Sequence, residues 1–207
     1  KKFFLTYEYR CNNLEIDHRE TLNSPAKPFG KSSTQEKWRV RIIDTGGTHM
    51  TGSRVAQALD QIEKSGQEFT NFALTYGDGL SDVNLAEEYK FHLAHGKIGT
   101  ILAVKPVARF GELEISSDGQ VEGFMEKPEF KQSLVNGGFF FLKREFRKYL
   151  STDQNCVLER APLEKLSQDN ELMSFPHFGF WYPMDTLRDK VFLQSLWDQN
   201  KAPWINV

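Results

Sequence analysis

Two aspartates stand where each could hold a hard cation. Asp78 lies between Gly77 and Gly79 directly after an apolar run, where bare backbone can approach a ligand closely. Asp185 follows the aromatic segment 178–182 and comes just before an expected helix. Because Mg²⁺ takes one or two carboxylates and fills its remaining positions with phosphate oxygens and water, these acids predict a magnesium site on phosphates. Their structural alternatives are a turn aspartate at 78 and a helix N-cap at 185.

Five further residues could contact a phosphate or a sugar. Thr51 and Arg54 belong to an expected helix start, where free amides and the helix dipole favour phosphate and an arginine can add a bidentate clamp. Glu126 and Lys127 follow an expected strand, and an acid beside a base suits sugar hydroxyls and a phosphate. Asn136 precedes two glycines, which open space for a hydroxyl-rich ligand. The structural alternatives are a capping turn for Thr51 and Arg54, a surface ion pair for residues 126 and 127, and a bulge or close strand packing for the two glycines.

Five other reactive residues favour plain structural interpretations. His92 and His95 have no third metal ligand nearby in sequence, so we expect them at the surface or in packing. Asp82 indicates a helix start more than a ligand. Cys11 and Cys156 lack metal-type spacing and are expected to be unpaired thiols in a reducing compartment.

The elements that must position these residues alternate between strands and helices. Residues 38–42 alternate apolar and basic side chains as a strand would, and a helical period with Thr51 as its cap follows. The run 72–76 is typical of a buried parallel strand, and a helix opened by Asn84 and closed at Gly96 leads to a strand at 100–104. This pattern predicts an α/β fold with a mainly parallel sheet, where ligands collect at the carboxyl ends of strands.

The second half of the chain has shorter β segments and two more helical patterns. We expect the β segments to extend the sheet and wall the site. We find no internal repeat and predict a single domain over residues 1–207, with a flexible loop at 23–37 rich in Pro, Ser, Lys and Gly. The β segments are 113–115, 120–125 and 135–142, and the helical patterns are 157–166 and 187–197.

Composition narrows the class of protein. The chain has 207 residues, is 39% hydrophobic, and can bury a substantial core. Its 26 basic and 28 acidic residues give a net charge of -2, which argues against a general attraction to nucleic acid or to an anionic membrane. We see no signal peptide and no apolar stretch near the roughly 20 residues of a membrane span, and we expect a cytoplasmic protein.

Six motifs occur in order from about residue 38 to residue 204, and the combination is more specific than any one of them. Together they resemble the motifs of bacterial glucose-1-phosphate cytidylyltransferases, which are sugar nucleotidyltransferases. The motifs are Asp44-Thr45-Gly46 with Met50-Thr51-Gly52-x-Arg54, Thr75-Tyr76-Gly77-Asp78-Gly79, Arg109-Phe110-Gly111, Glu126-Lys127-Pro128, Asn136-Gly137-Gly138-Phe139-Phe140, and Phe180-Trp181-x-Pro183-Met184-Asp185-Thr186-Leu187-Arg188-Asp189-Lys190.

The resemblance implies a Rossmann-like fold with a mainly parallel mixed sheet flanked by helices, and a reaction in which CTP and glucose 1-phosphate give CDP-glucose and pyrophosphate. Such an activity supplies a nucleotide sugar for O-antigen and lipopolysaccharide biosynthesis. The resemblance further implies a homo-oligomer, for example a hexamer, with the loop at 23–37 as a contact or a lid.

Site roles follow from the same resemblance. It implies that Asp78 and Asp185 hold Mg²⁺. The nucleotide site would include Gly77 and Arg54, with Thr51 beside them. The glucose phosphate would be held by residues 126, 127 and 136.

The chain departs from the family pattern at two places. The family's opening strand and its Gly-Gly-x-Gly-x-Arg triphosphate loop are not in this sequence, so we expect a preceding βαβ segment to be absent and the chain as given to be inactive without it. His49 stands where a small hydroxyl residue is expected near the nucleotide. Two other hypotheses are a non-catalytic nucleotide-sugar-binding or regulatory module, including a truncated inactive copy, and a metal-dependent glycosyltransferase. The glycosyltransferase is disfavoured because Asp-x-Asp is missing after Tyr76.

Overall fold

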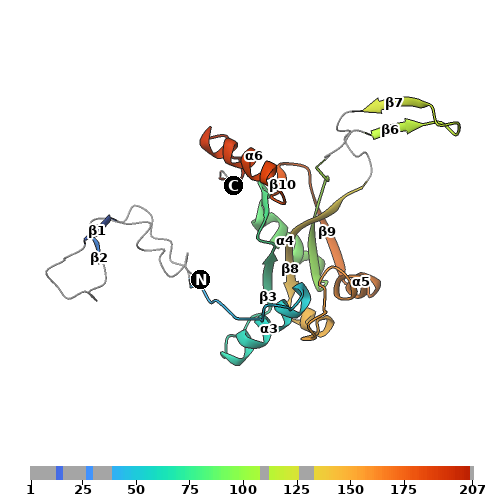
Figure 1. Ribbon diagram of the computed structural model, residues 1–207. Coiled ribbons are helices and arrows are strands. Elements are labelled where there is room, and N and C mark those ends of the chain that lie inside the picture. Colours follow the sequence, from blue (N-terminus) through green and yellow to red (C-terminus); the bar gives the residue numbers. More distant parts are fainter. Residues whose placement is uncertain (1–12, 16–26, 30–38, 108–111, 126–132, 206–207) are drawn as a thin grey trace. The chain divides into compact units, whose positions relative to one another are not determined.

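The computed structural model describes residues 13–15, 27–29, 39–107, 112–125 and 133–205 (Figure 1). The chain divides into two compact units, residues 1–46 and 47–207. In the first unit, β1 (Asn13–Glu15) pairs antiparallel with β2 (Lys27–Phe29), which falls inside the loop expected at 23–37. The rest of that loop lies outside the described residues.

The strand expected at 38–42 is wrong over its described part. Residues 39–42 form no strand, and Val40 and Ile42 are 44% and 43% exposed. Alternation of apolar and basic side chains is only a tendency, because a strand exists when its backbone pairs with another.

The second unit is built on a four-stranded mixed sheet with the order β3-β8-β5-β9. Strand β8 runs antiparallel to both neighbours, whereas β5 and β9 are parallel, so β3, β5 and β9 all point the same way. The prediction of an α/β fold with a mixed sheet is confirmed. The strands are β3 (Asn71–Thr75), β5 (Gly99–Val104), β8 (Val135–Lys143) and β9 (Leu172–His177).

Strand β8 decides the architecture. Instead of extending the sheet at one side, it lies between β3 and β5. Its side chains explain this place: Phe140 and Leu142 are fully buried on one face, while Phe141 packs against Tyr89 on the other. The predicted buried parallel strand at 72–76 is therefore half-exposed β3, paired antiparallel with β8 and at one edge of the described sheet.

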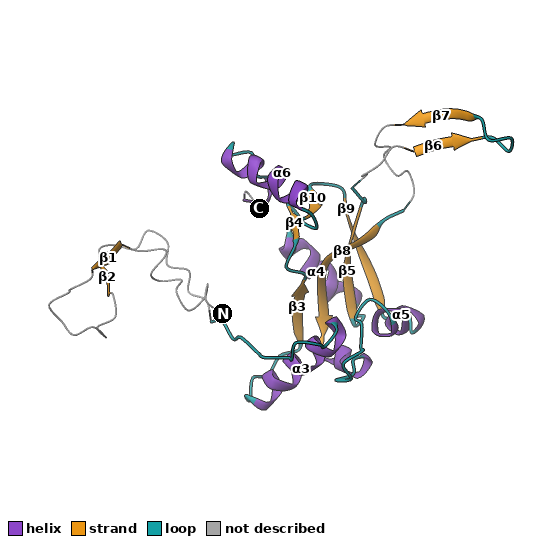
Figure 2. Cartoon of the chain, in the orientation of Figure 1, coloured by secondary structure: helices purple, strands orange, loops and turns teal. Residues whose placement is uncertain are grey.

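Helices cover both faces of the sheet (Figure 2). One face carries the main core, to which α3 (Thr51–Lys64), η1 (Arg144–Tyr149) and α5 (Ala161–Gln168) contribute. The other face carries α4 (Leu85–His95), which contacts β5, β8 and β9. The main core contains Ala56, Leu59, Ile98, Phe140, Leu142, Phe146, Leu150, Leu158, Leu163 and Leu166.

Helix α4 buries its polar face. Glu88 and His92 are 0% exposed, whereas Leu85 and Leu93 are 46% and 53% exposed. The predicted helix ends are confirmed: the Asn84 side chain accepts the amides of residues 86 and 87, and Gly96 takes a left-handed conformation with φ 71°.

Shorter elements complete the second unit. Strand β4 (Gly79–Ser81) pairs antiparallel with β10 (Trp181–Pro183), and α6 (Leu187–Asp198) follows β10. Strands β6 (Glu112–Ile115) and β7 (Val121–Met125) pair with each other as a hairpin, and the chain continues to η2 (Pro203–Ile205). In the described part of the chain, no helix is both long and apolar enough to cross a membrane.

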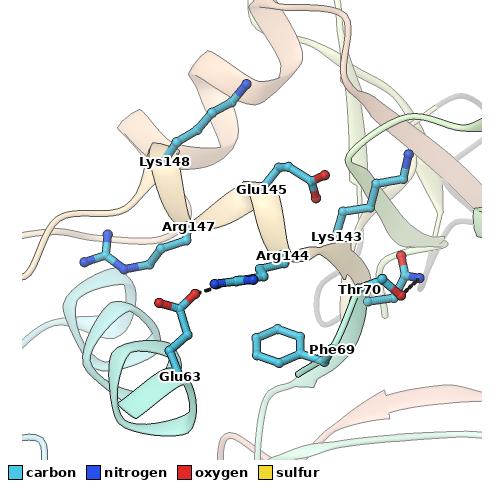
Figure 3. A pocket seen from close by; sticks show the side chains of 9 residues that line it. Glu63, Phe69, Thr70, Lys143, Arg144, Glu145, Arg147 and Lys148 are labelled. Atoms are coloured by element: carbon cyan, nitrogen blue, oxygen red, sulfur yellow. Dashed lines mark hydrogen bonds and ion pairs between the residues drawn. The ribbon is translucent and has the colours of Figure 1, made fainter. Parts of the chain in front are cut away.

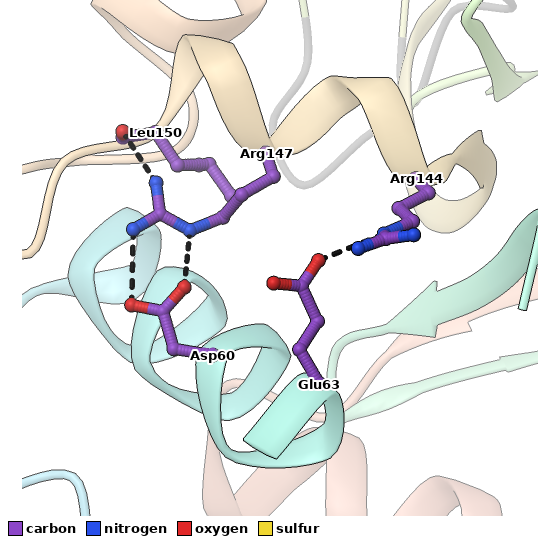
Figure 4. A network of polar contacts seen from close by, with 5 residues as sticks. All are labelled: Asp60, Glu63, Arg144, Arg147 and Leu150. Atoms are coloured by element: carbon purple, nitrogen blue, oxygen red, sulfur yellow. Dashed lines mark hydrogen bonds and ion pairs between the residues drawn. The ribbon is translucent and has the colours of Figure 1, made fainter. Parts of the chain in front are cut away.

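Ion pairs bind α3 to η1 (Figure 4). The Arg147 guanidinium donates from Nε and Nη2 to the two carboxylate oxygens of Asp60, at 2.7 and 3.0 Å. Arg144 donates from Nε to Glu63 at 2.8 Å. These contacts join elements that are more than 80 residues apart in sequence.

Candidate active site

The two predicted metal ligands come together at one end of the β4–β10 pair. In that ladder Gly79 stands opposite Pro183, and the Met184 amide donates to the Asp78 carbonyl at 2.8 Å. Asp78 and Asp185 are thus next to residues that pair with each other, and both are exposed. Two acids more than 100 residues apart in sequence therefore occupy neighbouring, exposed backbone positions.

The local structure rules out the capping interpretation of Asp185. Helix α6 is capped by Thr186, whose hydroxyl accepts the Asp189 amide at 3.2 Å while the Asp189 carboxylate accepts the Thr186 amide at 2.9 Å. This reciprocal pair is a capping box. Asp185 precedes the cap, so the N-cap alternative was wrong.

The glycines on either side of Asp78 have different surroundings. At Gly77 an added Cβ would meet no atom within 4 Å, and the residue is exposed. At Gly79 a Cβ would lie 3.7 Å from the Gly137 carbonyl and 3.8 Å from the Trp181 indole nitrogen. The open face at Gly77 leaves room for a ligand to reach the backbone.

Asn136 is held beside the end of β3. Its Nδ2 donates to the Tyr76 hydroxyl at 3.1 Å, and its Oδ1 accepts the Gly138 amide at 2.8 Å. Gly138 has φ +80° and an added Cβ would lie 2.7 Å from the Tyr76 ring. At Gly137 a Cβ would lie 3.0 Å from Val104, and the β5–β8 register shifts between Ile101 and Ala103, opposite this segment. Both structural interpretations of these glycines, close packing and a break in regular pairing, are therefore confirmed.

Thr51 takes part in the same network. Its hydroxyl donates to the Glu159 carboxylate at 3.0 Å and accepts the Leu158 amide at 3.0 Å. The other Glu159 oxygen accepts the Tyr76 hydroxyl at 2.5 Å. The prediction of Thr51 as the helix cap was wrong, because α3 begins at Thr51 and Met50 occupies the cap position.

Another segment of the chain, around Cys156, already contacts the start of α3. The Ser53 amide donates to the Cys156 carbonyl at 3.1 Å, and a Cβ at Gly52 would lie 2.7 Å from the Cys156 sulfur. One amide that a phosphate could use is therefore already bonded. Arg54 donates from Nε to the His49 carbonyl at 2.8 Å and from Nη2 to the Gly47 carbonyl at 3.3 Å, so it braces the preceding loop.

Glu126 and Lys127 lie outside the described residues, as does the motif at 109–111. Of the predicted site residues, the structure brings Gly77, Asp78, Asn136 and Asp185 together where β3 ends, β8 begins and β10 ends. Thr51 joins them through hydrogen bonds.

Sequence reasoning missed three parts of this region. Glu159 carried no local signal, because its partners are 83 and 108 residues away. The Trp181 indole donates to the Gly137 carbonyl at 2.8 Å and so ties β10 to β8. Asp82 lies two residues before the Asn84 cap, and its carboxylate, for which sequence reasoning gave no partner, lies 2.8 Å from His177 Nε2.

Electrostatics keep the Tyr76 hydroxyl protonated. Burial, together with the hydrogen bond to Glu159, raises the pKa of Tyr76 well above its usual value. The hydroxyl therefore remains a donor to Glu159 over the whole physiological range.

The two histidines of α4 serve packing, as expected. His92 Nδ1 and His95 Nε2 both lie within hydrogen-bond distance of the Thr100 hydroxyl, at 2.9 and 2.7 Å. Burial lowers the pKa of His92 to about 4, so its imidazole is neutral at pH 7. Over the described ranges, no three His, Cys, Asp or Glu side chains are grouped to hold a metal.

A cavity of about 740 Å³ lies at the opposite end of β3 and β8, where Asn71 pairs with Lys143 (Figure 3). Its two arginines, Arg144 and Arg147, are ion-paired with Glu63 and Asp60. Of the two lysines in its lining, Lys143 donates to the Gly96 carbonyl and Lys148 lies over the Tyr149 ring. We assign no ligand to this cavity.

Comparison with known proteins decides the family. The nucleotidyl transferase family model matches residues 17–183, which is most of the chain. This chain belongs to the nucleotidyl transferase family. Among curated relatives, the glucose-1-phosphate cytidylyltransferase of Salmonella typhi is 39% identical over 200 residues, covering 97% of this chain and 70% of the relative. The probable glucose-1-phosphate cytidylyltransferase of Bacillus subtilis is 34% identical over 204 residues, covering 99% and 75%.

The resemblance that the motifs predicted is therefore confirmed. Among solved structures, a putative glucose-1-phosphate thymidylyltransferase from Bacillus anthracis matches with a TM-score of 0.52 and 15% identity, covering 81% of this chain and 65% of the other. That likeness supports the fold of this nucleotidyl transferase, whose chain spans less than two thirds of the matched structure.

Proposed function

We propose that this nucleotidyl transferase moves a cytidylyl group from CTP to glucose 1-phosphate, giving CDP-glucose and pyrophosphate. The observation that carries the proposal is the 39% identity over 97% of the chain to a relative named for that activity. The meeting of Asp78 and Asp185 beside the open backbone of Gly77 agrees with it.

The donor set at this place fits a magnesium ion. Two exposed carboxylates provide the hard oxygen ligands that Mg²⁺ prefers, and the open surroundings leave the other positions to phosphate oxygens and water. When bound, the ion would supply charge neutralisation on the transferred phosphate. In the proposal Asp78 and Asp185 hold it.

The remaining residues would align the two substrates. Gly77, Thr51 and Arg54 would border the nucleotide, and Asn136 would hold the glucose phosphate together with Glu126 and Lys127. An oxygen of glucose 1-phosphate then attacks the α-phosphorus of CTP in line, and pyrophosphate leaves. Such transfer depends mainly on positioning and charge neutralisation, so no covalent role for the protein is needed.

We further propose a cytoplasmic homo-oligomer, for example a hexamer, that supplies CDP-glucose for O-antigen and lipopolysaccharide biosynthesis. The support is the relationship to curated bacterial cytidylyltransferases. A non-catalytic nucleotide-sugar-binding module is the competing hypothesis.

The test is pyrophosphate release from CTP, with UTP and dTTP in parallel, in the presence of glucose 1-phosphate and Mg²⁺. The 207-residue chain and any longer product of the same gene are assayed together. We expect release with CTP preferred. Binding of CDP-glucose without release from any form would instead support the binding module.

Asp78→Asn and Asp185→Asn test the metal site. Each should lower kcat by about 10²–10³-fold, because a developing charge loses its counterion. The melting temperature should change little, since both side chains are exposed. Asp198→Asn, an exposed carboxylate at the end of α6 whose partner is Gln194, is the matched control and should keep full activity. Near-normal turnover in either site variant would contradict the assignment.

A further inference from the structure

Glu159 connects side chains that belong to both proposed substrate sites. Its Oε2 accepts the Thr51 hydroxyl at 3.0 Å, and its Oε1 accepts the Tyr76 hydroxyl at 2.5 Å. Tyr76 in turn accepts from Asn136 Nδ2 at 3.1 Å. One carboxylate thus joins the start of α3, the end of β3 and the start of β8.

The direction of these hydrogen bonds follows from the chemistry of the groups. An ionised carboxylate can only accept, so the Tyr76 proton must point to Glu159. The Tyr76 oxygen can then only accept, so the Asn136 side chain must turn its NH₂ group toward Tyr76. The Gly138 amide selects the carbonyl side of Asn136, at 2.8 Å. The Asn136 side chain is therefore held in one of its two flipped orientations.

Thr51 is oriented in the same way. The Leu158 amide donates to its hydroxyl oxygen at 3.0 Å, and the hydroxyl proton goes to Glu159. Each of the two hydroxyls accepts from one neighbour and donates to the same carboxylate. After these bonds, Asn136 retains one Nδ2 hydrogen and one Oδ1 lone pair in a known direction.

We infer that Glu159 is a positioning residue of the transfer reaction, which sets the orientation of Asn136 toward the sugar phosphate through Tyr76 and that of Thr51 toward the nucleotide. The inference rests on the proposed function for the identity of the two substrates. Glu159 would act through other side chains and would touch neither substrate.

A glutamine at 159 has nearly the same shape but different hydrogen-bonding capacity. Its amide offers one acceptor and one donor group, so it can accept only one of the two hydroxyl protons. If the amide nitrogen of the introduced glutamine faces Tyr76, the Tyr76 hydroxyl hydrogen must turn away from residue 159. It then points toward Asn136 and competes with the hydrogen that Asn136 Nδ2 donates. The substitution therefore disturbs orientation while it preserves volume.

The experiment compares Glu159→Gln, Tyr76→Phe and the double variant, with Glu164→Gln as a control that removes an exposed carboxylate from α5. We measure kcat, the KM of glucose 1-phosphate and of CTP, and the melting temperature. Glu159→Gln should lower kcat/KM by about 10- to 100-fold, the usual cost of losing a supporting hydrogen-bond partner, with the melting temperature nearly unchanged. The loss in the double variant should equal that of the worse single variant, because both changes break one chain of bonds.

A second measurement does not depend on activity. The ¹⁵N–¹H resonances of the Asn136 side-chain amide, assigned from their loss in Asn136→Ala, should shift in Glu159→Gln and stay in place in Glu164→Gln. Unchanged resonances, or losses that multiply in the double variant, would overturn the inference. If the wild-type protein releases no pyrophosphate, the proposed function fails, and the amide resonances alone decide whether Glu159 positions Asn136.

Discussion

Gly77 and Gly138 illustrate two uses of glycine within one site. Gly77 faces open space, whereas Gly138 has φ +80° and lies against the Tyr76 ring. The first glycine offers access to backbone, and the second permits a conformation and a contact that any side chain would prevent.

Alanine substitutions should separate these roles. Gly77→Ala should change the free energy of unfolding by less than about 0.5 kcal/mol, as exposed substitutions usually do, while raising the KM of CTP. Gly138→Ala should destabilise the fold by roughly 1–3 kcal/mol because of its strained backbone, besides the clash with Tyr76. Urea unfolding and steady-state kinetics check both. Equal stability losses at the two positions would contradict this division.

Glu88 is a buried acid whose effect depends on pH. Neither of its carboxylate oxygens has a hydrogen-bond partner among the described residues, and burial raises its pKa from 4.5 to about 7. The folded pKa lies above the unfolded value. Its stabilising contribution is therefore full below pH 4.5 and is lost as the pH rises through about 7.

Glu88→Met should remove this dependence. At pH 8.5 we expect the variant to be more stable than the wild-type protein by up to about 3 kcal/mol, since each pKa unit corresponds to about 1.4 kcal/mol. At pH 5.5 the gain should fall to about 1.4 kcal/mol, because Glu88 is then protonated in the folded protein and the pH is only one unit above the pKa of 4.5 of the unfolded carboxyl. Urea unfolding at the two pH values is the measurement, and a gain that does not vary with pH would contradict the explanation.

At the scale of elements, the joint between α3 and η1 rests on two arginines with unequal geometry. Arg147 makes a bidentate pair with Asp60 and also donates to the Leu150 carbonyl at 3.1 Å (Figure 4). Arg144 makes a single contact with Glu63 and is more exposed, with 53% of its side chain accessible. Bidentate, partly buried pairs contribute more than exposed single contacts.

Arg147→Met should therefore cost about 1–2 kcal/mol, and Arg144→Met less than about 1 kcal/mol. The hydrogen bond from Arg147 lowers the pKa of Asp60 below 3.8, so this pair stabilises the fold above pH 3.8 and is lost as the pH falls through the lower, folded value. Urea unfolding at pH 7 and below pH 3 compares the two variants. Equal costs at pH 7 would show that the bidentate geometry is unimportant.

The orientation of α4 is another property of elements in contact. Sequence periodicity places Leu85, Tyr89 and Leu93 on one stripe, which would ordinarily face a core. The structure instead buries Glu88 and His92. The two ring nitrogens of His92 lie 2.9 Å from the Thr100 hydroxyl and 3.0 Å from the Asn71 side-chain oxygen. Hydrogen-bond partners on β5 and β3 account for the inward position of His92, whereas Glu88 is buried without such a partner among the described residues.

At the scale of the whole molecule, the second unit has helices on both faces of its sheet, and the candidate site lies at one end of the strands of that sheet. We expect the exposed apolar residues of α6 to contribute to the interface between subunits of the proposed homo-oligomer. Leu187 and Val191 are 74% and 61% exposed and lie one helical turn apart. Such side chains suit a contact between copies of the chain.

Val191→Glu should therefore reduce the assembly to smaller species in sedimentation velocity without lowering the melting temperature. Lys190→Glu, which places a negative charge on the neighbouring residue of the same helix, is the matched control. A wild-type protein that sediments as a monomer would contradict the proposed oligomer.

The sequence by itself determined what short-range chemistry controls. The Asn84 cap and the stop at Gly96 depend on neighbours within a few residues, and both are present in the structure. The strand expected at 100–104 is present as β5 (Gly99–Val104), although the strands it pairs with lie far away in sequence. The family followed from the order of motifs and is confirmed by comparison.

The tertiary structure alone decided the long-range matters. It placed β8 between β3 and β5 and turned the polar face of α4 inward. It also brought Glu159 to Thr51, 108 residues away. Strand pairing and long-range side-chain hydrogen bonds depend on which segments meet in space, and the residues around one segment do not indicate which distant segment it will contact.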